Sequence, residues 1–159
     1  MILQAEKSDL SECLDIIRKS FTTVADEFGL TEQNCPTNGA FMKIDRLERD
    51  FNDGNLMFCY YNSFGAVGFV QINKVSDDTF EMRKLAVVPE CRHMGIGREL
   101  IDFVKAKVTE FGGRKITIGI IDEDTRLKDW YAENGFMPVS IQTFSHLPFT
   151  VGYMEFRLG

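Results

Sequence analysis

The sequence predicts a single mixed α/β (α+β) domain, built on a mostly antiparallel sheet of about seven strands flanked by about four helices. Three observations lead to this prediction. The chain has 159 residues, 44% of them hydrophobic, which is enough for one buried core. The spacing of apolar residues changes from helical to alternating near Leu56. A strand, a bend with glycines and a helix then follow one another around Gly95 and Gly97.

The first third of the chain has mostly helical spacing. Residues 2–5 are expected to form a short edge strand. Ser8 is expected to be the N-cap of a long helix that ends near Gly29, because an apolar stripe follows it at positions Leu10, Cys13, Leu14, Ile17 and Phe21. A second helix, ended by the turn 52–55, is expected from the apolar register of Phe41, Ile44, Leu47 and Phe51.

The rest of the chain alternates strands with two helices. Short turns predict an antiparallel meander of strands over 56–61, 66–75 and 80–88. A helix over 95–111 is expected to point Leu100, Ile101, Val104, Val108 and Phe111 inward. A strand over 115–121, a helix over 125–134 and strands over 136–144 and 151–158 complete the order β-α-α-β-β-β-α-β-α-β-β. The unit 80–121 is expected to be a right-handed parallel crossover, a type of unit whose ligands gather at the carboxyl ends of strands.

Composition argues against several classes of function. The net charge of −6 argues against general nucleic-acid binding, which needs a basic face. No apolar run is long enough for a leader peptide or a membrane span. The four cysteines include no CxxC pair, and His93 and His146 lie far apart, so no metal site is predicted. We expect a cytoplasmic protein with free thiols and with neither a membrane nor a nucleic-acid partner.

The stretch from Arg92 to Gly97 is suited to binding a phosphate. Glycine lets the backbone approach an anion, and a helix start presents unpaired N–H groups and a partial positive charge. The spacing excludes a P-loop, and a dinucleotide fingerprint would need glycine where Leu100 stands. The glycines alone leave two alternatives open, an anion cradle or a plain strand-to-helix turn.

Three segments in the same order resemble the GNAT superfamily of N-acetyltransferases. Arg92 to Gly97 matches the Gln/Arg-x-x-Gly-x-Gly/Ala signature of that family, and 85–89 resembles its Leu-x-Val-x-Pro strand end. The segment 130–136, Trp-Tyr-Ala-Glu-Asn-Gly-Phe, resembles the family's Leu-Tyr-Glu-Lys-x-Gly-Phe. The resemblance covers essentially the whole chain, 1–159. It implies acceptor-framing helices over 8–52, an acetyl-CoA-binding core over 56–136 and C-terminal strands over 136–158.

The resemblance also implies roles for particular residues. Backbone amides of the motif would hold the pyrophosphate of the co-substrate acetyl-CoA, and the strand end would pair with pantetheine and polarise the acetyl carbonyl. Tyr131 would be the general acid and Glu81 the general base. Asp124 departs from the asparagine of many members, and an acidic N-cap of the following helix is the alternative for it. The residues implied to bind acetyl-CoA are Leu85, Ala86, Val87, Arg92, His93, Met94, Gly95, Ile96, Gly97 and Arg98.

Other interpretations of these residues stay open at this point. Tyr131 also fits an amphipathic core position, and Glu81 also fits an ion pair with Arg83 or Lys84. The segments 21–41 and 145–150 are implied to frame the acceptor, with a possible apolar slot walled by Phe28, Phe41, Phe144 and Phe149. We expect a small-molecule amine or a peptide amine as acceptor.

The rival functions are a non-catalytic acyl-CoA-binding regulatory module and a nucleotide- or phosphometabolite-binding protein. A homodimer is a further expectation, with the last strand, 151–158, as the exposed edge across which two copies pair.

Overall fold

The computed structural model describes all residues from 1 to 159. Its element order is the predicted one, with three short 3-10 turns added at Lys7–Asp9, Gly39–Phe41 and Pro89–Cys91. The strands are β1 (Ile2–Gln4), β2 (Leu56–Asn62), β3 (Gly65–Lys74), β4 (Thr79–Val87), β5 (Lys115–Ile121), β6 (Met137–Thr143) and β7 (Thr150–Arg157). The helices are α1 (Leu10–Glu27), α2 (Ile44–Asn52), α3 (Ile96–Glu110) and α4 (Thr125–Glu133).

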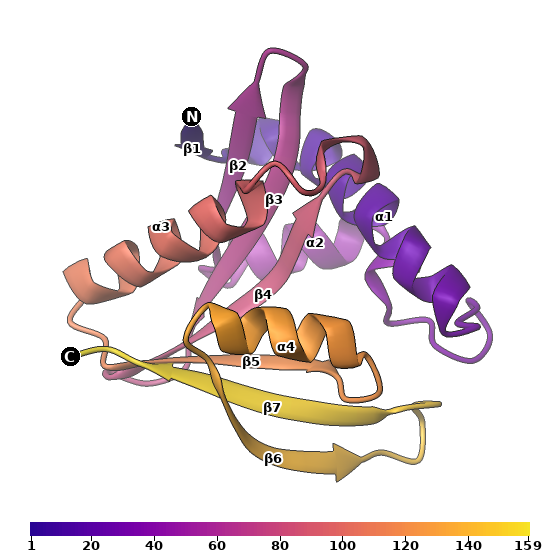
Figure 1. Cartoon of the computed structure of the whole chain (residues 1–159). Helices are drawn as coiled ribbons and strands as arrows, with labels where there is room; N and C mark the ends of the chain where they lie inside the picture. Colours follow the sequence, from indigo (N-terminus) through magenta and orange to yellow (C-terminus); the bar gives the residue numbers. More distant parts are fainter.

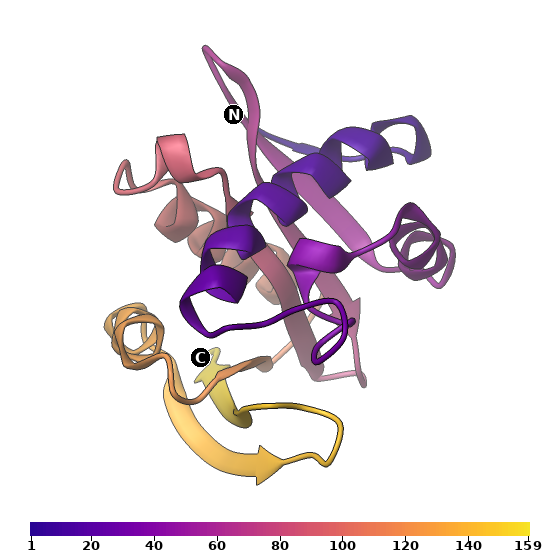
Figure 2. The same ribbon diagram turned by 90° about the vertical axis from the view of Figure 1, so that its right-hand side faces the viewer.

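The seven strands form one sheet in the order β1-β2-β3-β4-β5-β7-β6. Every neighbouring pair is antiparallel except β4 and β5, which are parallel, as the predicted crossover requires. Helices α1 and α2 cover one face of the sheet and α3 and α4 the other (Figures 1 and 2). The predicted α+β fold is confirmed. None of the helices combines the length and the apolar character that a membrane-spanning segment needs.

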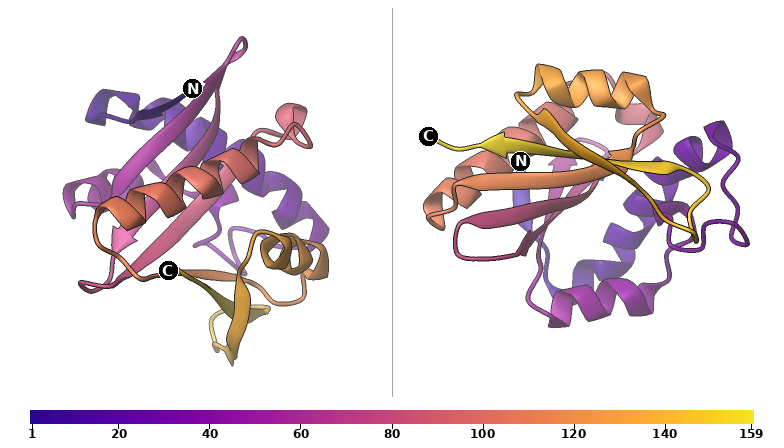
Figure 3. Two further views of the ribbon diagram at one scale, coloured as in Figure 1. Left: turned by 60° about the vertical axis from the view of Figure 1, so that its left-hand side comes forward. Right: turned by 90° about the horizontal axis from the view of Figure 1, so that it is seen from below.

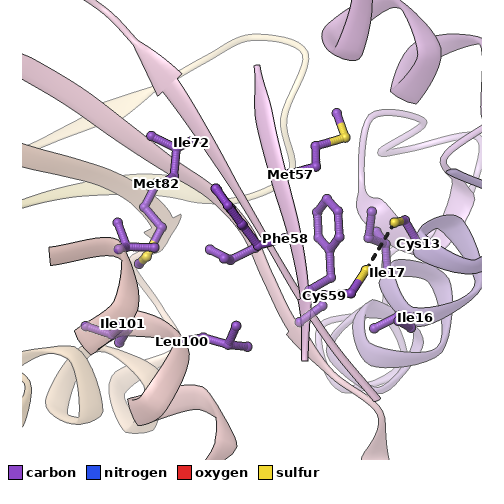
Figure 4. Close-up of a cluster of buried hydrophobic side chains, with 14 of the residues drawn as sticks. Cys13, Ile16, Ile17, Met57, Phe58, Cys59, Ile72, Met82, Leu100 and Ile101 are labelled. Atoms are coloured by element: carbon purple, nitrogen blue, oxygen red, sulfur yellow. Dashed lines mark hydrogen bonds between the residues drawn. The ribbon is translucent and has the colours of Figure 1, made fainter. Parts of the chain in front are cut away.

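The core lies on both faces of the central strands, because successive side chains of a strand point in opposite directions. In β2, Phe58 points toward α3, where its ring packs edge-on against Phe103 at 4.8 Å between centroids. Its neighbour Cys59 points toward α1, and the Sγ atoms of Cys13 and Cys59 lie 3.3 Å apart (Figure 4). Hydrogen bonding to Cys59 and burial raise the pKa of the Cys13 thiol, which favours the protonated form.

Two local predictions about helices are wrong. Ser8 is not an N-cap: the turn Lys7–Asp9 precedes α1, and Asp9 accepts a 2.8 Å hydrogen bond from the N–H of Glu6. Phe111 is not inward: it follows the last turn of α3, is 45% exposed, and stacks on Phe80 at 5.8 Å. The other four apolar residues predicted to line the inner face of α3 are buried.

The last strand is also not the sheet edge that the sequence predicted. Strand β7 pairs with β5 along its whole length and with β6 on its other side. The hairpin therefore inserts β7 into the sheet and leaves β6, all of whose residues are exposed, at the edge.

Candidate active site

The loop before α3 presents a row of main-chain N–H groups that have no hydrogen-bond partner inside the protein. Gly95, the N-cap of α3, has a left-handed backbone with φ of 82°, and His93 is left-handed as well, with φ of 63°. No N–H from His93 through Arg98 donates to a protein atom. Consecutive free amides at a helix start form a concavity for an anion, and the helix dipole adds positive potential there.

Arg92 has a different place from the one predicted. Its N–H donates to the carbonyl of Pro89 at 3.3 Å, so the row of free amides begins one residue later. Its guanidinium turns to α1, where Nη2 donates to the carbonyl of Ser20 at 2.8 Å. Arg92 therefore ties the loop to α1.

Gly97 brings the start of α3 close to α4. A Cβ added there would lie 3.1 Å from two ring carbons of Trp130, tighter than ordinary packing. The ring of Trp130 packs edge-on against that of Tyr131, with 5.0 Å between centroids. The absence of a side chain at Gly97 thus lets the helix that carries Tyr131 lie against the free amides.

Strands β4 and β5 pair only at their beginnings, where Thr79–Glu81 lies beside Lys115–Thr117, and they then diverge (Figure 1). Within β4, Lys84 has a left-handed backbone with φ of 53°, and the register with β3 shifts there, as in a β-bulge. Beyond the bulge, the N–H of Val88 donates to Val67 of β3 at 2.9 Å. By strand alternation, the N–H groups of Val87 and Leu85 point to the open side.

The predicted pantetheine-binding residues lie on this open edge. Leu85 and Val87 are half-buried and Ala86 is buried. The N–H of Val87 has one partner, the Oγ of Ser20 on α1, at 3.3 Å. An edge of this kind accepts an added strand through main-chain hydrogen bonds.

Tyr131 is buried on α4, between the rings of Trp130 and Phe136. Burial raises the pKa of its phenol, and no charged group or hydrogen bond contributes to that shift. The phenol therefore keeps its proton at neutral pH and has it to donate. The whole residue is only 6% exposed, which also fits the core position that the sequence offered as the alternative.

Glu81 is half-buried at the point where β4 and β5 separate. Its Oε1 accepts a hydrogen bond from Nε of Arg83 at 2.6 Å, so the ion pair that the sequence offered as an alternative is present. Its neighbours Phe80 and Met82 belong to the main core, and Phe80 packs on α3. Glu81 consequently points to the α1 and α2 face, opposite the face that carries Tyr131.

Lys84 belongs to a separate buried polar group. Its Nζ lies 3.0 Å from Oδ2 of Asp50, which also accepts from the amide of the fully buried Gln71 at 3.0 Å. Burial acts to raise the pKa of Asp50, but the hydrogen bonds from Gln71 and Lys84 and the charge of Lys84 lower it on balance. Burial lowers the pKa of Lys84, with Asp50 opposing it. These charges hold α2 to the sheet.

Asp124 has the structural role that the sequence gave as its alternative. It is the N-cap of α4, and its Oδ1 accepts from the N–H of Leu127 at 3.2 Å. Lys128 and Asp122 form an ion pair beside it.

The two segments expected to frame the acceptor meet in a small apolar cluster. Four buried residues of α1, the loop after it and the end of β5 form its centre, namely Ala25, Leu30, Cys35 and Ile121. Phe28, Phe41 and Phe149 pack against this centre, and the loop after α1 lies near the turn between β6 and β7 (Figure 3). Phe144 does not join the cluster, because its ring packs on that of His146 at 5.6 Å.

Sequence reasoning missed Ser20. It is a hydroxyl residue next to the buried stripe of α1, after Ile16 and Ile17, and is only 8% exposed. A polar residue in an apolar stripe was the signal that could have found it, since a buried hydroxyl normally has a partner.

Taken together, these features fit a ligand of the coenzyme A type, with an anion cradle for its phosphate end and an open strand edge for its extended chain. A phenol and a carboxylate lie on opposite faces of the sheet beside them.

Comparison with known proteins agrees with this class. Residues 14–136 match the model of the Acetyltransferase (GNAT) family. The chain therefore belongs to the GNAT family of acetyltransferases, and the predicted activity, acetyl-CoA-dependent N-acetyl transfer, is confirmed at the level of the family.

Single relatives are distant in sequence and close in fold. An uncharacterized N-acetyltransferase in the pepI 3' region of Lactobacillus delbrueckii subsp. lactis is 24% identical over 156 residues, which cover 90% of this chain and 87% of the relative. The Escherichia coli ribosomal-protein-S18-alanine N-acetyltransferase matches with a TM-score of 0.78 at 15% identity, covering 99% of this chain and 92% of that one. The PaiA N-acetyltransferase of Thermoplasma acidophilum, solved in complex with coenzyme A, gives 0.76 at 16% identity, covering 99% and 98%.

Proposed function

We propose that this acetyl-CoA-dependent N-acetyltransferase moves its acetyl group by direct attack of a primary amine on the thioester within a ternary complex. The observation that carries the proposal is the run of free amides from His93 through Arg98 beside the open edge of β4. This arrangement suits a ligand with a pyrophosphate at one end and an extended amide chain behind it.

The two proposed catalytic groups lie on opposite faces of the sheet, where β4 and β5 diverge. Glu81 faces α1 and α2, and Tyr131 comes from α4 on the other face. The amine would approach from the first face and the thiol would depart on the second. The divergence of the strands then serves as the passage in which the two substrates meet.

The reaction balances with these groups alone. The amine nitrogen forms a bond to the acetyl carbon, and the carbon–sulfur bond breaks. The charged amine first gives one proton to Glu81, directly or through water. The thiolate takes the phenolic proton of Tyr131, and that phenolate takes back the second proton, which the nitrogen loses as the amide forms. An N–H of β4 that points to the open edge, at Leu85 or Val87, is suited to stabilise the charge that develops on the carbonyl oxygen.

A base is needed because the acceptor is charged at neutral pH. A lysine-like amine has a pKa of about 10.4, so making it neutral at pH 7 costs roughly 4.6 kcal/mol. Glu81 is suited to this work, because its ion pair with Arg83 keeps the carboxylate in a fixed position at the passage. The same ion pair competes with the amine for the carboxylate.

The acceptor is proposed to be a small amine or a peptide amine with an apolar group beside the nitrogen. Phe28, Phe41 and Phe149 supply an apolar wall for such a group. A protein N-terminus is within this class, and the Escherichia coli neighbour is named for acetylating alanine of a ribosomal protein. We place the enzyme in the cytosol on the ground of its four free cysteines.

The test is release of free coenzyme A thiol from acetyl-CoA with a panel of aminoglycosides, polyamines, amino acids and peptides. We expect thiol release that depends on one class of amine, with the acetylated amine identified by mass. Binding of coenzyme A without thiol release for any amine would favour the regulatory module instead. Absence of coenzyme A binding in calorimetry would overturn the proposal altogether.

A further inference from the structure

Ser20 joins three elements of the donor site. Its side chain points from α1 toward β4, where its Oγ accepts the N–H of Val87 at 3.3 Å. Its carbonyl accepts Nη2 of Arg92 at 2.8 Å, and that nitrogen also lies 3.5 Å from the Oγ. Ser20 therefore contacts both the open strand edge and the first residue of the phosphate loop.

The hydroxyl of Ser20 bonds to a strand, whereas the neighbouring hydroxyls of α1 bond within the helix. Serine and threonine in a helix often donate to a carbonyl of the preceding turn. Thr22 does so to Arg18 at 2.6 Å, and Thr23 does so to the carbonyl of Ser20 at 3.0 Å. Ser20 instead accepts from a strand 67 residues away along the chain. The contact is therefore a tertiary hydrogen bond that satisfies a main-chain N–H of β4.

Val87 needs this partner because its N–H points away from β3, toward the open edge of β4. The next N–H, that of Val88, donates to Val67 on β3, so the N–H of Val87 faces the side where β5 no longer pairs. Val87 is half-buried, and a main-chain N–H in such a place is costly when it has no acceptor. Ser20 supplies the acceptor that a neighbouring strand would otherwise supply.

We propose that Ser20 caps the donor-binding edge of β4 in the free enzyme, and that the pantetheine arm of acetyl-CoA displaces its hydroxyl from Val87. The inference rests on the proposed function, because it takes the open edge of β4 as the pantetheine site. An extended amide chain that adds to this edge uses the same N–H, and one N–H makes one good hydrogen bond at a time. Binding of acetyl-CoA then replaces the hydrogen bond from Val87 to Ser20 with one from Val87 to the pantetheine arm.

Removing Ser20 should therefore strengthen donor binding, whereas removing a residue that contacts the ligand weakens it. Since the Ser20–Val87 bond exists only in the free enzyme, it stabilises the free state and weakens donor affinity. Ser20→Ala removes the competing acceptor, and alanine suits the interior of a helix at least as well as serine does. The variant is therefore expected to fold and to bind coenzyme A more tightly than the wild type.

The experiment is calorimetric titration of coenzyme A into the wild-type chain of 159 residues and into its variants Ser20→Ala, Ser20→Cys and Thr22→Ala. We expect the dissociation constant of Ser20→Ala to fall about three- to tenfold, the range expected for one net hydrogen bond. Ser20→Cys has a weaker acceptor of similar size, so its dissociation constant should lie between those of Ser20→Ala and the wild type. Thr22→Ala is the matched control on the same helix, and its affinity should equal that of the wild type.

Two further measurements make the test specific. Adenosine 3′,5′-bisphosphate lacks the pantetheine arm, so Ser20→Ala should leave its affinity unchanged. In thermal unfolding, Ser20→Ala should melt below the wild type when free and show a larger rise on adding coenzyme A. Equal or weaker coenzyme A binding by Ser20→Ala, or equal tightening toward the bisphosphate, would overturn the inference. Failure of the wild type to bind coenzyme A would overturn the proposed function, and this inference with it.

Discussion

Replacing Tyr131 by phenylalanine removes one oxygen from the proposed site and keeps the aromatic packing around it. The ring lies edge-on to Phe136 at 5.5 Å and to Trp130 at 5.0 Å between centroids, and phenylalanine preserves both contacts. Burial alone raises the pKa of the phenol, so no hydrogen bond of the hydroxyl is lost with it. We expect the free energy of unfolding to change by less than about 0.5 kcal/mol.

The expected effect on turnover follows from the acidity of the two groups. A general acid contributes about 10²–10⁴-fold. The leaving thiol has a pKa of about 8.5, whereas burial raises that of Tyr131 above its ordinary value of 10.0, so the proton transfer is uphill. The contribution should lie at the low end of the range, and we expect kcat to fall about 100-fold, or about 2.7 kcal/mol of barrier.

The assay is thiol release at saturation with both substrates, together with coenzyme A affinity by calorimetry and thermal unfolding. Tyr153→Phe, on the partly buried β7, is the matched control and should keep full turnover. A kcat of Tyr131→Phe within twofold of the wild type would refute the role of Tyr131 as acid. A parallel loss of coenzyme A affinity or of stability would show that the ring, rather than its proton, had been disturbed.

Three other predictions concern neighbouring groups. Glu81→Gln should lower turnover about 100-fold near pH 7, with the deficit shrinking as the pH nears about 10.4, where the amine becomes neutral by itself; a deficit that does not vary with pH would argue against a base. Gly97→Val should displace Trp130, the single tryptophan, because a Cβ would lie 3.1 Å from its ring; we expect a shifted emission spectrum and a loss of about 1–3 kcal/mol in urea unfolding, and an unchanged spectrum would contradict the contact. Asp50→Asn should be less stable than the wild type by about 1–3 kcal/mol at neutral pH. Since the pKa of Asp50 is lowered from 3.8, its contribution is present above that pH and lost as the pH falls through the lowered value. The gap in stability between Asp50→Asn and the wild type should therefore be constant above about pH 3.8 and narrow as the pH falls below it, and a gap that stays constant in acid would count against the carboxylate.

The sequence predicted most of the fold because its elements are strongly periodic. Strand β5 has the predicted bounds, Lys115–Ile121, since isoleucines alternate along it and glycines precede it. The motif from Arg92 to Gly97 was singled out by its spacing and by its resemblance to the family, and Tyr131 by the resemblance alone. The errors at Ser8 and Phe111 lie at helix ends, where one residue of shift decides whether a side chain caps, packs or is exposed.

The partners of the site residues could not be predicted, because they depend on tertiary contacts. The register of the sheet places β7 inside it, and nothing in the composition of 151–158 distinguishes an inner strand from an edge. Arg92 was implied to bind acetyl-CoA, yet one of its guanidinium nitrogens donates to a carbonyl on α1. The contact between Ser20 and Val87 joins two segments whose own periodicity gives no reason for them to meet.

The donor site also shows how a fold can keep main-chain amides available for a ligand. Exposed main-chain amides, such as those of His93 and Met94, can donate to water and need no protein partner. The amide of Val87 is half-buried, and there the chain supplies a side-chain acceptor from α1. A side chain is a better choice than a strand for this purpose, because a strand would fill the whole edge while a hydroxyl occupies one N–H and leaves by rotation about χ1. The divergence of β5 from β4 opens the edge of β4. Ser20 lowers the free-energy cost of that opening in the free protein, because it supplies an acceptor for the half-buried N–H of Val87.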